Sequence, residues 1–141
     1  MNEQDKKSHF HVSAGLIWKN GKVLIAKRPK GSHNEGLWEF PGGKQEKGES
    51  MEDCLKREIE EELDIKVKVD KALIAVDHKY ETKTICLHAF NCTLKKGKPK
   101  SLQGQQFRWV YPVDFHKYIF APPDMKVIGF LSHYDNKEKI P

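Results

Sequence analysis

The chain has 141 residues, 38% of them hydrophobic and 10% aromatic, and its 25 lysines and arginines outnumber its 20 aspartates and glutamates. This length predicts one domain over residues 1–141, with no room for a second independent core. No apolar run approaches the ~18 residues needed to cross a bilayer, which argues against a membrane protein. The net charge of +5 suggests a polyanionic partner.

The cysteines and the first residues bear on the cellular compartment. Cys54, Cys86 and Cys92 are odd in number and lack CxxC spacing, and residues 1–10 contain no apolar signal core. Both features lead us to expect a reduced, cytoplasmic chain.

The first third of the chain predicts a hairpin followed by a long loop. His11–Trp18 and Val23–Lys27 are rich in β-forming residues, and Asn20-Gly21 between them suits a tight primed turn. The glycine-rich stretch Pro29–Gly48 is long for a connection without secondary structure, and loops of this length usually carry function.

An amphipathic helix is expected next. Ser50 is its predicted N-cap, with Asp53 three residues on as an imperfect capping box. Apolar residues then recur every four positions to the predicted helix end, at Met51, Leu55, Ile59 and Leu63.

The second half predicts further strands and a last helix. Three segments are rich in β-branched and aromatic residues: 65–76, 84–94 and 106–111. We expect a basic turn at Lys95–Lys100, a helical turn after Pro112, and Asp124 as N-cap of a helix over Met125–His133. This order of strands and helices predicts an α+β fold in which helices cover the faces of a mixed sheet.

Three glutamates on the first helix are the sharpest feature. Glu58, Glu61 and Glu62 stand at i, i+3 and i+4 and therefore project from one face. Such a run is most often a solvated surface. However, crowded like charges are unfavourable unless a cation lies among them, and Mg²⁺ prefers oxygen ligands, waters and substrate phosphates. A metal and phosphate site is therefore the competing hypothesis.

The spacing around these glutamates resembles the Nudix box, G-x5-E-x7-R-E-U-x-E-E-x-G-U, in which U is aliphatic. Over residues 43–65 the chain carries eight of its nine fixed positions: Gly43, Glu49, Arg57, Glu58, Ile59, Glu61, Glu62 and Ile65. Asp64 replaces the second glycine, at a helix end where a left-handed conformation is common and Asp tolerates it better than most residues. We expect a small cost in stability there and no loss of chemistry.

The resemblance covers about residues 11–131 and narrows to the MutT-like branch of Nudix hydrolases. Ala26–Pro29 and Gly36–Lys44 are similar to that branch's approach to the box, and Trp109 and Phe120–Ile128 are similar to its C-terminal portion. The resemblance implies an α/β/α sandwich around a mixed sheet. It also implies an enzyme that cleaves nucleoside triphosphates to the monophosphate and pyrophosphate.

The resemblance further implies a metal site. Glu58, Glu61 and Glu62 would bind Mg²⁺ or Mn²⁺, with the backbone carbonyl of Gly42 or Gly43 as a further ligand. Bound cations would neutralise the negative charge of the phosphoryl transition state and orient the attacking water.

Two neighbouring roles follow from the same comparison. Arg57 would orient the acidic cluster by pairing with a carboxylate, for which Glu49 is the expected partner. Several related enzymes supply another acid from the loop before the last sheet strand, where this chain has Gln103. A glutamine cannot take a proton from water, so either Glu61 or Glu62 would serve as the base or turnover would be slower.

Family comparison also points to a base pocket. Phe40 and Tyr80 would form apolar or stacking walls, Arg28 would lie near the sugar and phosphates with Lys44 in support, and Asp124 would bond the base edge. Phe40 as a core residue, Arg28 as a surface charge and Asp124 as a helix cap are the alternatives. Members that select 8-oxoguanine often have Asn where Asp124 stands. An ionised Asp only accepts hydrogen bonds, whereas a protonated one would also donate.

Two other features have weaker interpretations. His9 and His11 would share one strand face, but a histidine pair without a third ligand is more often structural or solvent-exposed than metal-binding. The lysines of Lys95–Lys100 could contact phosphate or RNA, although such a stretch is more often a solvated turn.

The leading hypothesis is a metal-dependent nucleoside triphosphate pyrophosphohydrolase for nucleotide-pool sanitation, with 8-oxo-dGTP as substrate. Hydrolysis of CTP or modified dCTP and removal of pyrophosphate from RNA 5′ ends stay open. A non-catalytic nucleotide-binding module is the alternative of another class, and the intact box carboxylates weigh against it. The chain is expected to be a monomer or homodimer.

Overall fold

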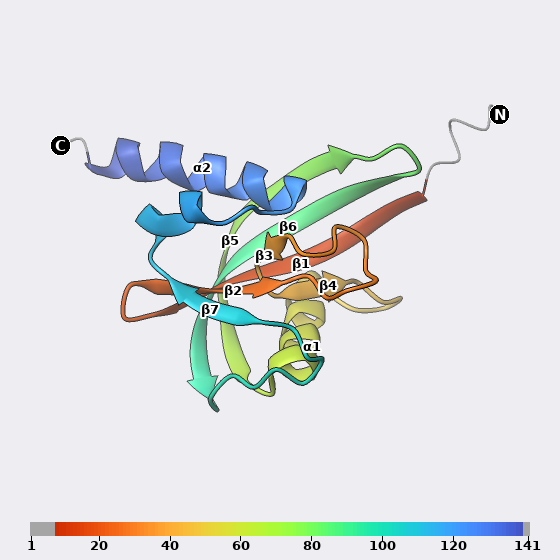
Figure 1. Ribbon diagram of the computed structural model, residues 1–141, viewed down its shortest axis with the longest axis horizontal. Helices are drawn as coiled ribbons and strands as arrows, with labels where there is room; N and C mark the ends of the chain where they lie inside the picture. Colours follow the sequence, from red (N-terminus) through yellow and green to blue (C-terminus); the bar gives the residue numbers. More distant parts are fainter. Residues whose placement is uncertain (1–7, 140–141) are drawn as a thin grey trace.

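The computed structural model describes residues 8–139, in which seven strands form one sheet and a helix covers each face (Figure 1). Along the chain the elements are β1 (Ser8–Lys19), β2 (Lys22–Lys27), β3 (Trp38–Glu39), β4 (Gly42–Lys44), α1 (Met51–Leu63), β5 (Lys66–Lys79), β6 (Lys83–Lys96), β7 (Phe107–Val110), a 3-10 helix (Pro112–Lys117) and α2 (Pro122–Lys139). Within residues 8–139, no helix is long and apolar enough to cross a membrane.

The sheet is mixed, as predicted. Its strand order is β3-β2-β1-β6-β5, with β4 paired to β1 and β7 paired to β2. The long strands β1 and β6 run parallel from Ser8 opposite Lys83 to Trp18 opposite Thr93, and the other pairs are antiparallel. The predicted hairpin joins β1 to β2, with Asn20 and Gly21 at φ of 51° and 78° in its turn.

The alternation of side chains along the strands divides the core into two layers. Leu16 of β1 faces the layer that contains Val127 of α2, whereas its neighbour Ile17 faces the layer that contains Leu55 and Ile59 of α1. All five side chains are fully buried. The helices therefore pack on opposite faces of the sheet, which gives the expected α/β/α arrangement.

Helix α1 begins and ends as its sequence predicts. The Ser50 hydroxyl accepts a hydrogen bond from the Asp53 N–H at 3.1 Å. Asp64 follows the last helical residue in the left-handed conformation, with φ 54° and ψ 41°, and its N–H donates to the Glu60 carbonyl. The chain thus adopts at Asp64 the conformation for which glycine is usual.

Some expected boundaries were wrong. The long loop contains the short strands β3 and β4, and Lys95 and Lys96 belong to β6 rather than to a turn. Asp124 is not the N-cap of the last helix, because α2 already begins at Pro122 and Asp124 lies within its first turn. Proline suits the first helical positions, where an N–H would have no helical partner.

Candidate active site

A cavity of about 250 Å³ lies among the loop after β2, β4, α1 and the start of α2. Charged side chains from these segments, from β3 and from β6 line it: Arg28, Glu39, Lys44, Glu58, Glu62, Lys83 and Asp124. Four acids and three bases are thus gathered around a space that is partly apolar, with Val12, Ile85 and Leu87 on the sheet side.

Two glycines allow β4 to pass between β1 and the carboxylates of α1. A Cβ at Gly42 would collide with the Ser13 carbonyl, and a Cβ at Gly43 would collide with the carboxyl group of Glu58. The Gly42 N–H donates to Glu62. The Gly43 carbonyl accepts from the Ser13 hydroxyl at 3.2 Å, so this carbonyl is held close to β1.

The acids of the cavity raise one another's pKa. Burial raises the pKa of Glu62 to about 9, and the charges of Glu39 and Glu58 add to the rise. Burial also raises the pKa of Glu39 and of Glu58. Carboxyl groups crowded in this way are best stabilised by a cation, and a donor set made of oxygens suits a hard divalent ion. The residues present therefore fit Mg²⁺ or Mn²⁺.

Arg57 connects this cluster to the loop before α1. Its Nε and Nη2 donate to the two carboxylate oxygens of Glu49 at 2.6 and 2.9 Å, and its Nη1 lies 3.0 Å from Glu58 and 3.2 Å from Glu61. The hydrogen bonds from Arg57 lower the pKa of Glu49 to about 2, and those to Glu49 and Glu58 raise the pKa of Arg57. The expected pairing of Arg57 with Glu49 is present as a two-point ion pair.

Two further residues, Glu61 and the Gln103 that stands where related enzymes have an acid, lie outside the cavity lining. The Glu61 side chain is 54% exposed and is turned toward Arg57, so the structure brings Glu58 and Glu62 together in the cavity and Glu61 beside it. Gln103 is exposed in a loop that is tied to the end of α1 by a hydrogen bond from the Leu102 N–H to the Glu62 carbonyl. Gln103 itself donates its N–H to Gln105.

Asp124 reaches across the fold to Phe40, which directly follows β3. Its carboxyl oxygen accepts a hydrogen bond from the Phe40 N–H at 2.9 Å, and the side chain lines the cavity. Burial, with the charge of Glu39 in addition, raises the pKa of Asp124 well above its ordinary value. A carboxyl group that keeps its proton can both donate and accept hydrogen bonds.

The aromatic residues of the expected base pocket differ in exposure. Phe40 lines the cavity, but it is only 2% exposed and its ring packs against Phe115 and Phe120, so it is mainly a core residue. Tyr80 is half-buried, and its hydroxyl accepts from Asn34 at 2.9 Å. Tyr80 is therefore the better placed of the two rings to meet a ligand.

Glu39 lies at the centre of this arrangement and was not predicted as a site residue. Its carboxylate pairs with Arg28 at 3.0 Å and influences the pKa values of both Glu62 and Asp124. Its charge within the otherwise apolar and aromatic stretch 37–41 was the sequence feature that could have indicated a functional role. His33, Asn34 and Lys83 also line the cavity and were not singled out, because only the folded loop after β2 and the pairing of β6 bring them there.

Comparison with known proteins agrees with this architecture. The model of the NUDIX domain family matches residues 13–129. The chain is 35% identical over 119 residues to the CTP pyrophosphohydrolase of Escherichia coli (strain K12), covering 84% of this chain and 88% of that protein. It is 42% identical over 101 residues to an 8-oxo-dGTP diphosphatase of Proteus vulgaris, covering 71% and 89%.

Solved structures have the same fold. The solution structure of the E. coli ORF135 protein is 29% identical, with a TM-score of 0.81 over 97% of this chain and 98% of that one. A crystal structure of the MutT protein from Methanosarcina mazei Go1 is 23% identical, with a TM-score of 0.81 over 95% and 98%. These likenesses agree with a mixed sheet that has a helix on each face.

Proposed function

The chain belongs to the Nudix hydrolase family and is a pyrophosphohydrolase of its MutT branch, and from this premise we propose that it sanitises the nucleotide pool. In the proposed reaction, water cleaves a nucleoside triphosphate to the monophosphate and pyrophosphate, with 8-oxo-dGTP as the leading substrate. The observation that carries the proposal is the set of crowded acids, Glu39, Glu58 and Glu62, in one cavity with Arg28 and Lys83.

A divalent ion, Mg²⁺ or Mn²⁺, is part of the proposal. Glu58 and Glu62 would hold it, with Glu61 from the same helix and the carbonyl of Gly42 or Gly43 as further ligands. When bound, the ion neutralises the negative charge that develops on the phosphate oxygens. The raised pKa of Glu62 supports this assignment, because burial and the neighbouring carboxylates disfavour its charged form, and no lysine or arginine of the described residues forms an ion pair with it.

The chain's own residues would orient the reactants. Arg57, fixed by Glu49, holds Glu58 and Glu61 in place, and Arg28 and Lys44 face the phosphates. A water proton would pass to Glu62 or Glu61, and the place of Glu62 in the cavity lining favours Glu62.

Base recognition would rest on Asp124 and on the wall formed by Tyr80 and Phe40. A protonated Asp124 presents a donor and an acceptor, as the Asn of 8-oxoguanine-selective members does, which supports 8-oxo-dGTP. CTP is the second candidate. Asp124 and Glu39 lie close enough to influence each other's charge, and such a pair can accept from the cytosine amino group while donating to the ring nitrogen.

The test is pyrophosphate release with Mg²⁺ across a panel of 8-oxo-dGTP, dGTP, CTP, 5-methyl-dCTP and a triphosphorylated RNA. We expect release from at least one free nucleotide, abolished by Glu58→Gln and preserved in Glu60→Gln, a matched change on the exposed side of the same helix. Pyrophosphate release from the triphosphorylated RNA alone would identify RNA 5′ ends, and not free nucleotides, as the substrate. No release from any substrate, or full activity of Glu58→Gln, would refute the proposed reaction.

A further inference from the structure

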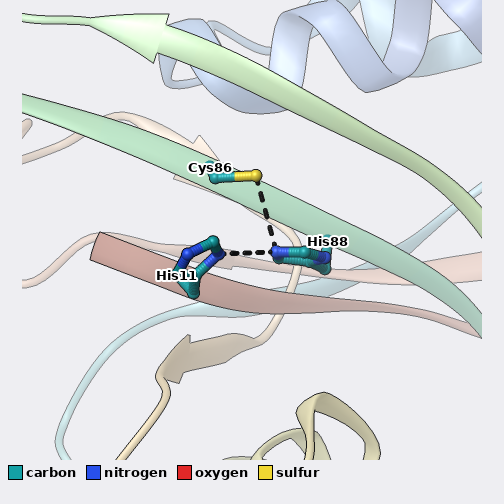
Figure 2. A group of neighbouring side chains, drawn as sticks. All are labelled: His11, Cys86 and His88. Carbon is teal, nitrogen blue, oxygen red and sulfur yellow. Dashed lines mark hydrogen bonds between the residues drawn. The ribbon is translucent and has the colours of Figure 1, made fainter. Parts of the chain in front are cut away.

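A second group of metal-ligating side chains lies away from the glutamates. Figure 2 shows His11 of β1 beside Cys86 and His88 of β6, which we call the His-Cys cluster. The Nδ1 of His11 lies 3.0 Å from the Nε2 of His88, and the Sγ of Cys86 lies 3.4 Å from the same nitrogen. All three ligand atoms lie within 4.8 Å of one another.

The cluster arises from the register of the parallel strands. His11 stands opposite Cys86, and Ser13 stands opposite His88, so the three side chains project from the same face. They alternate with Val12, Ile85 and Leu87, which line the nucleotide cavity on the other face. None of the three lines that cavity, although Ser13, on the same face of β1, does.

Two of the three distances between ligand atoms are close to those of a metal centre. In a tetrahedral zinc site, with Zn–N near 2.0–2.1 Å and Zn–S near 2.3 Å, two nitrogen ligands lie ~3.3 Å apart and a nitrogen and a sulfur ~3.6 Å apart. The observed 3.0 and 3.4 Å are each within a few tenths of an ångström of these values. Small side-chain rotations would therefore make room for an ion among the three ligand atoms.

We propose that His11, Cys86 and His88 bind a transition-metal ion of the zinc class at a second site, chemically distinct from the carboxylate site. Imidazole and thiolate ligands favour Zn²⁺ over Mg²⁺, whereas the all-oxygen set of the cavity has the opposite preference. Exposed His11 and half-buried Cys86 and His88 leave the site open to solvent. Asp77 of β5 stands opposite Cys86 of β6, and its carboxylate contacts the Cys86 thiol. Either this carboxylate or a water molecule would be the fourth ligand.

Such an ion would connect β1 to β6, whose pairing forms the centre of the sheet. An ion that binds the folded chain and not the unfolded chain stabilises the fold by mass action. The proposal goes beyond the hydrolase function and does not depend on it. The alternative is that the three side chains only bond one another, as the same short distances allow.

Cobalt binding distinguishes a metal site from three side chains that only bond one another. Co²⁺ is titrated into the protein under reducing conditions with Mg²⁺ in large excess, which occupies the carboxylate site. We expect one equivalent to bind with the thiolate-to-cobalt charge-transfer absorption and the strong visible bands of a tetrahedral site, and Zn²⁺ to displace it. Zn²⁺ should also raise the thermal midpoint of the wild type.

Matched variants localise the effect. Cys86→Ala should abolish the charge-transfer band, whereas Cys92→Ala, on the same strand, should keep it. His11→Gln should weaken Co²⁺ binding at least ~10-fold, whereas His9→Gln, two residues away on the same strand, should not. Circular dichroism checks that each variant is folded. A cobalt spectrum without a thiolate band, or one unchanged in folded Cys86→Ala, would overturn the proposed site.

Discussion

Arg57 binds Glu49 through two hydrogen bonds, from Nε to Oε2 at 2.6 Å and from Nη2 to Oε1 at 2.9 Å. The remaining nitrogen, Nη1, lies 3.0 Å from Glu58. One planar guanidinium thereby fixes the loop before α1 and a carboxylate of the cavity at the same time. Because lysine presents a point charge rather than a fork, it cannot reproduce both contacts.

Arg57→Lys should therefore impair catalysis while leaving a folded protein. We expect kcat to fall roughly 10- to 100-fold with a smaller change in KM, because a misplaced carboxylate affects the reacting centre more than substrate binding. Steady-state kinetics with the best substrate of the panel measure both constants. Lys56→Gln changes the exposed neighbouring residue and should be neutral. If Arg57→Lys and the wild type have the same kcat, Arg57 does not position the carboxylates.

The low pKa of Glu49 predicts a pH dependence of stability. Its pKa is about 2 in the folded protein and about 4.5 when unperturbed, so the ion pair stabilises the fold above pH ~4.5. This contribution is lost as the pH falls from about 4.5 through 2. Denaturant unfolding at several pH values should show Glu49→Gln less stable than wild type at pH 7, with the difference shrinking toward pH 2. A difference independent of pH would contradict the pairing.

The left-handed Asp64 should cost stability. Replacing it by glycine relieves the Cβ strain, and the exposed contact that it loses with Lys100, at 3.8 Å, is worth little. We expect Asp64→Gly to raise the free energy of unfolding by roughly 0.5–1 kcal/mol and Asp64→Ala to lower it by a similar amount. Pyrophosphate release should be unchanged in the glycine variant. Destabilisation by glycine would show that the Asp64 side chain makes a more important contact.

How far the sequence predicts this structure depends on the range of the interactions. The Asn20-Gly21 turn, the Ser50 cap and the Asp64 helix end are set by residues next to one another, and each was predicted correctly. Strands β3 and β4 were missed. Gly42 and Gly43 of β4 have little strand propensity of their own and pair because β1 is beside them, and the two residues of β3 form a strand only by pairing with β2.

The candidate site divides in the same way. Glu49 and Arg57 are eight residues apart in one loop and helix, so their pairing could be anticipated from the motif. The bond between Asp124 and Phe40 spans 84 residues, and the contact of His11 with His88 spans 77. No local pattern encodes such distances; they follow from the packing of α2 and from the register of β1 with β6.

Glu62 should destabilise the metal-free protein. Its pKa of about 9 means that the folded form keeps a proton which the unfolded chain releases near pH 4.5, so stability falls as the pH rises from about 4.5 to 9. Glu62→Gln removes this ionisation. In EDTA at pH 8 we expect the variant to be more stable by on the order of 1–3 kcal/mol, yet inactive when Mg²⁺ is restored. Excess Mg²⁺ should shrink the stability difference, and Glu60→Gln should show neither effect. A variant less stable than wild type in EDTA would contradict the raised pKa.

Asp124 offers a test of base selection that is separable from folding. In Asp124→Asn the amide oxygen can still accept from the Phe40 N–H, so the anchoring bond at 2.9 Å is retained and stability should change little. The amide differs from the carboxyl group in the hydrogen bonds that it offers to the base. It cannot ionise, and its NH2 group always donates. We expect kcat/KM for 8-oxo-dGTP to be kept or raised and that for CTP to fall, changing their ratio by roughly 10-fold or more, since the loss of one well-placed hydrogen bond costs about that much. Asp114→Asn, an acid of the 3-10 helix outside the cavity lining, is the control. If Asp124→Asn changes both substrates equally, Asp124 supports the loop through Phe40 and does not read the base.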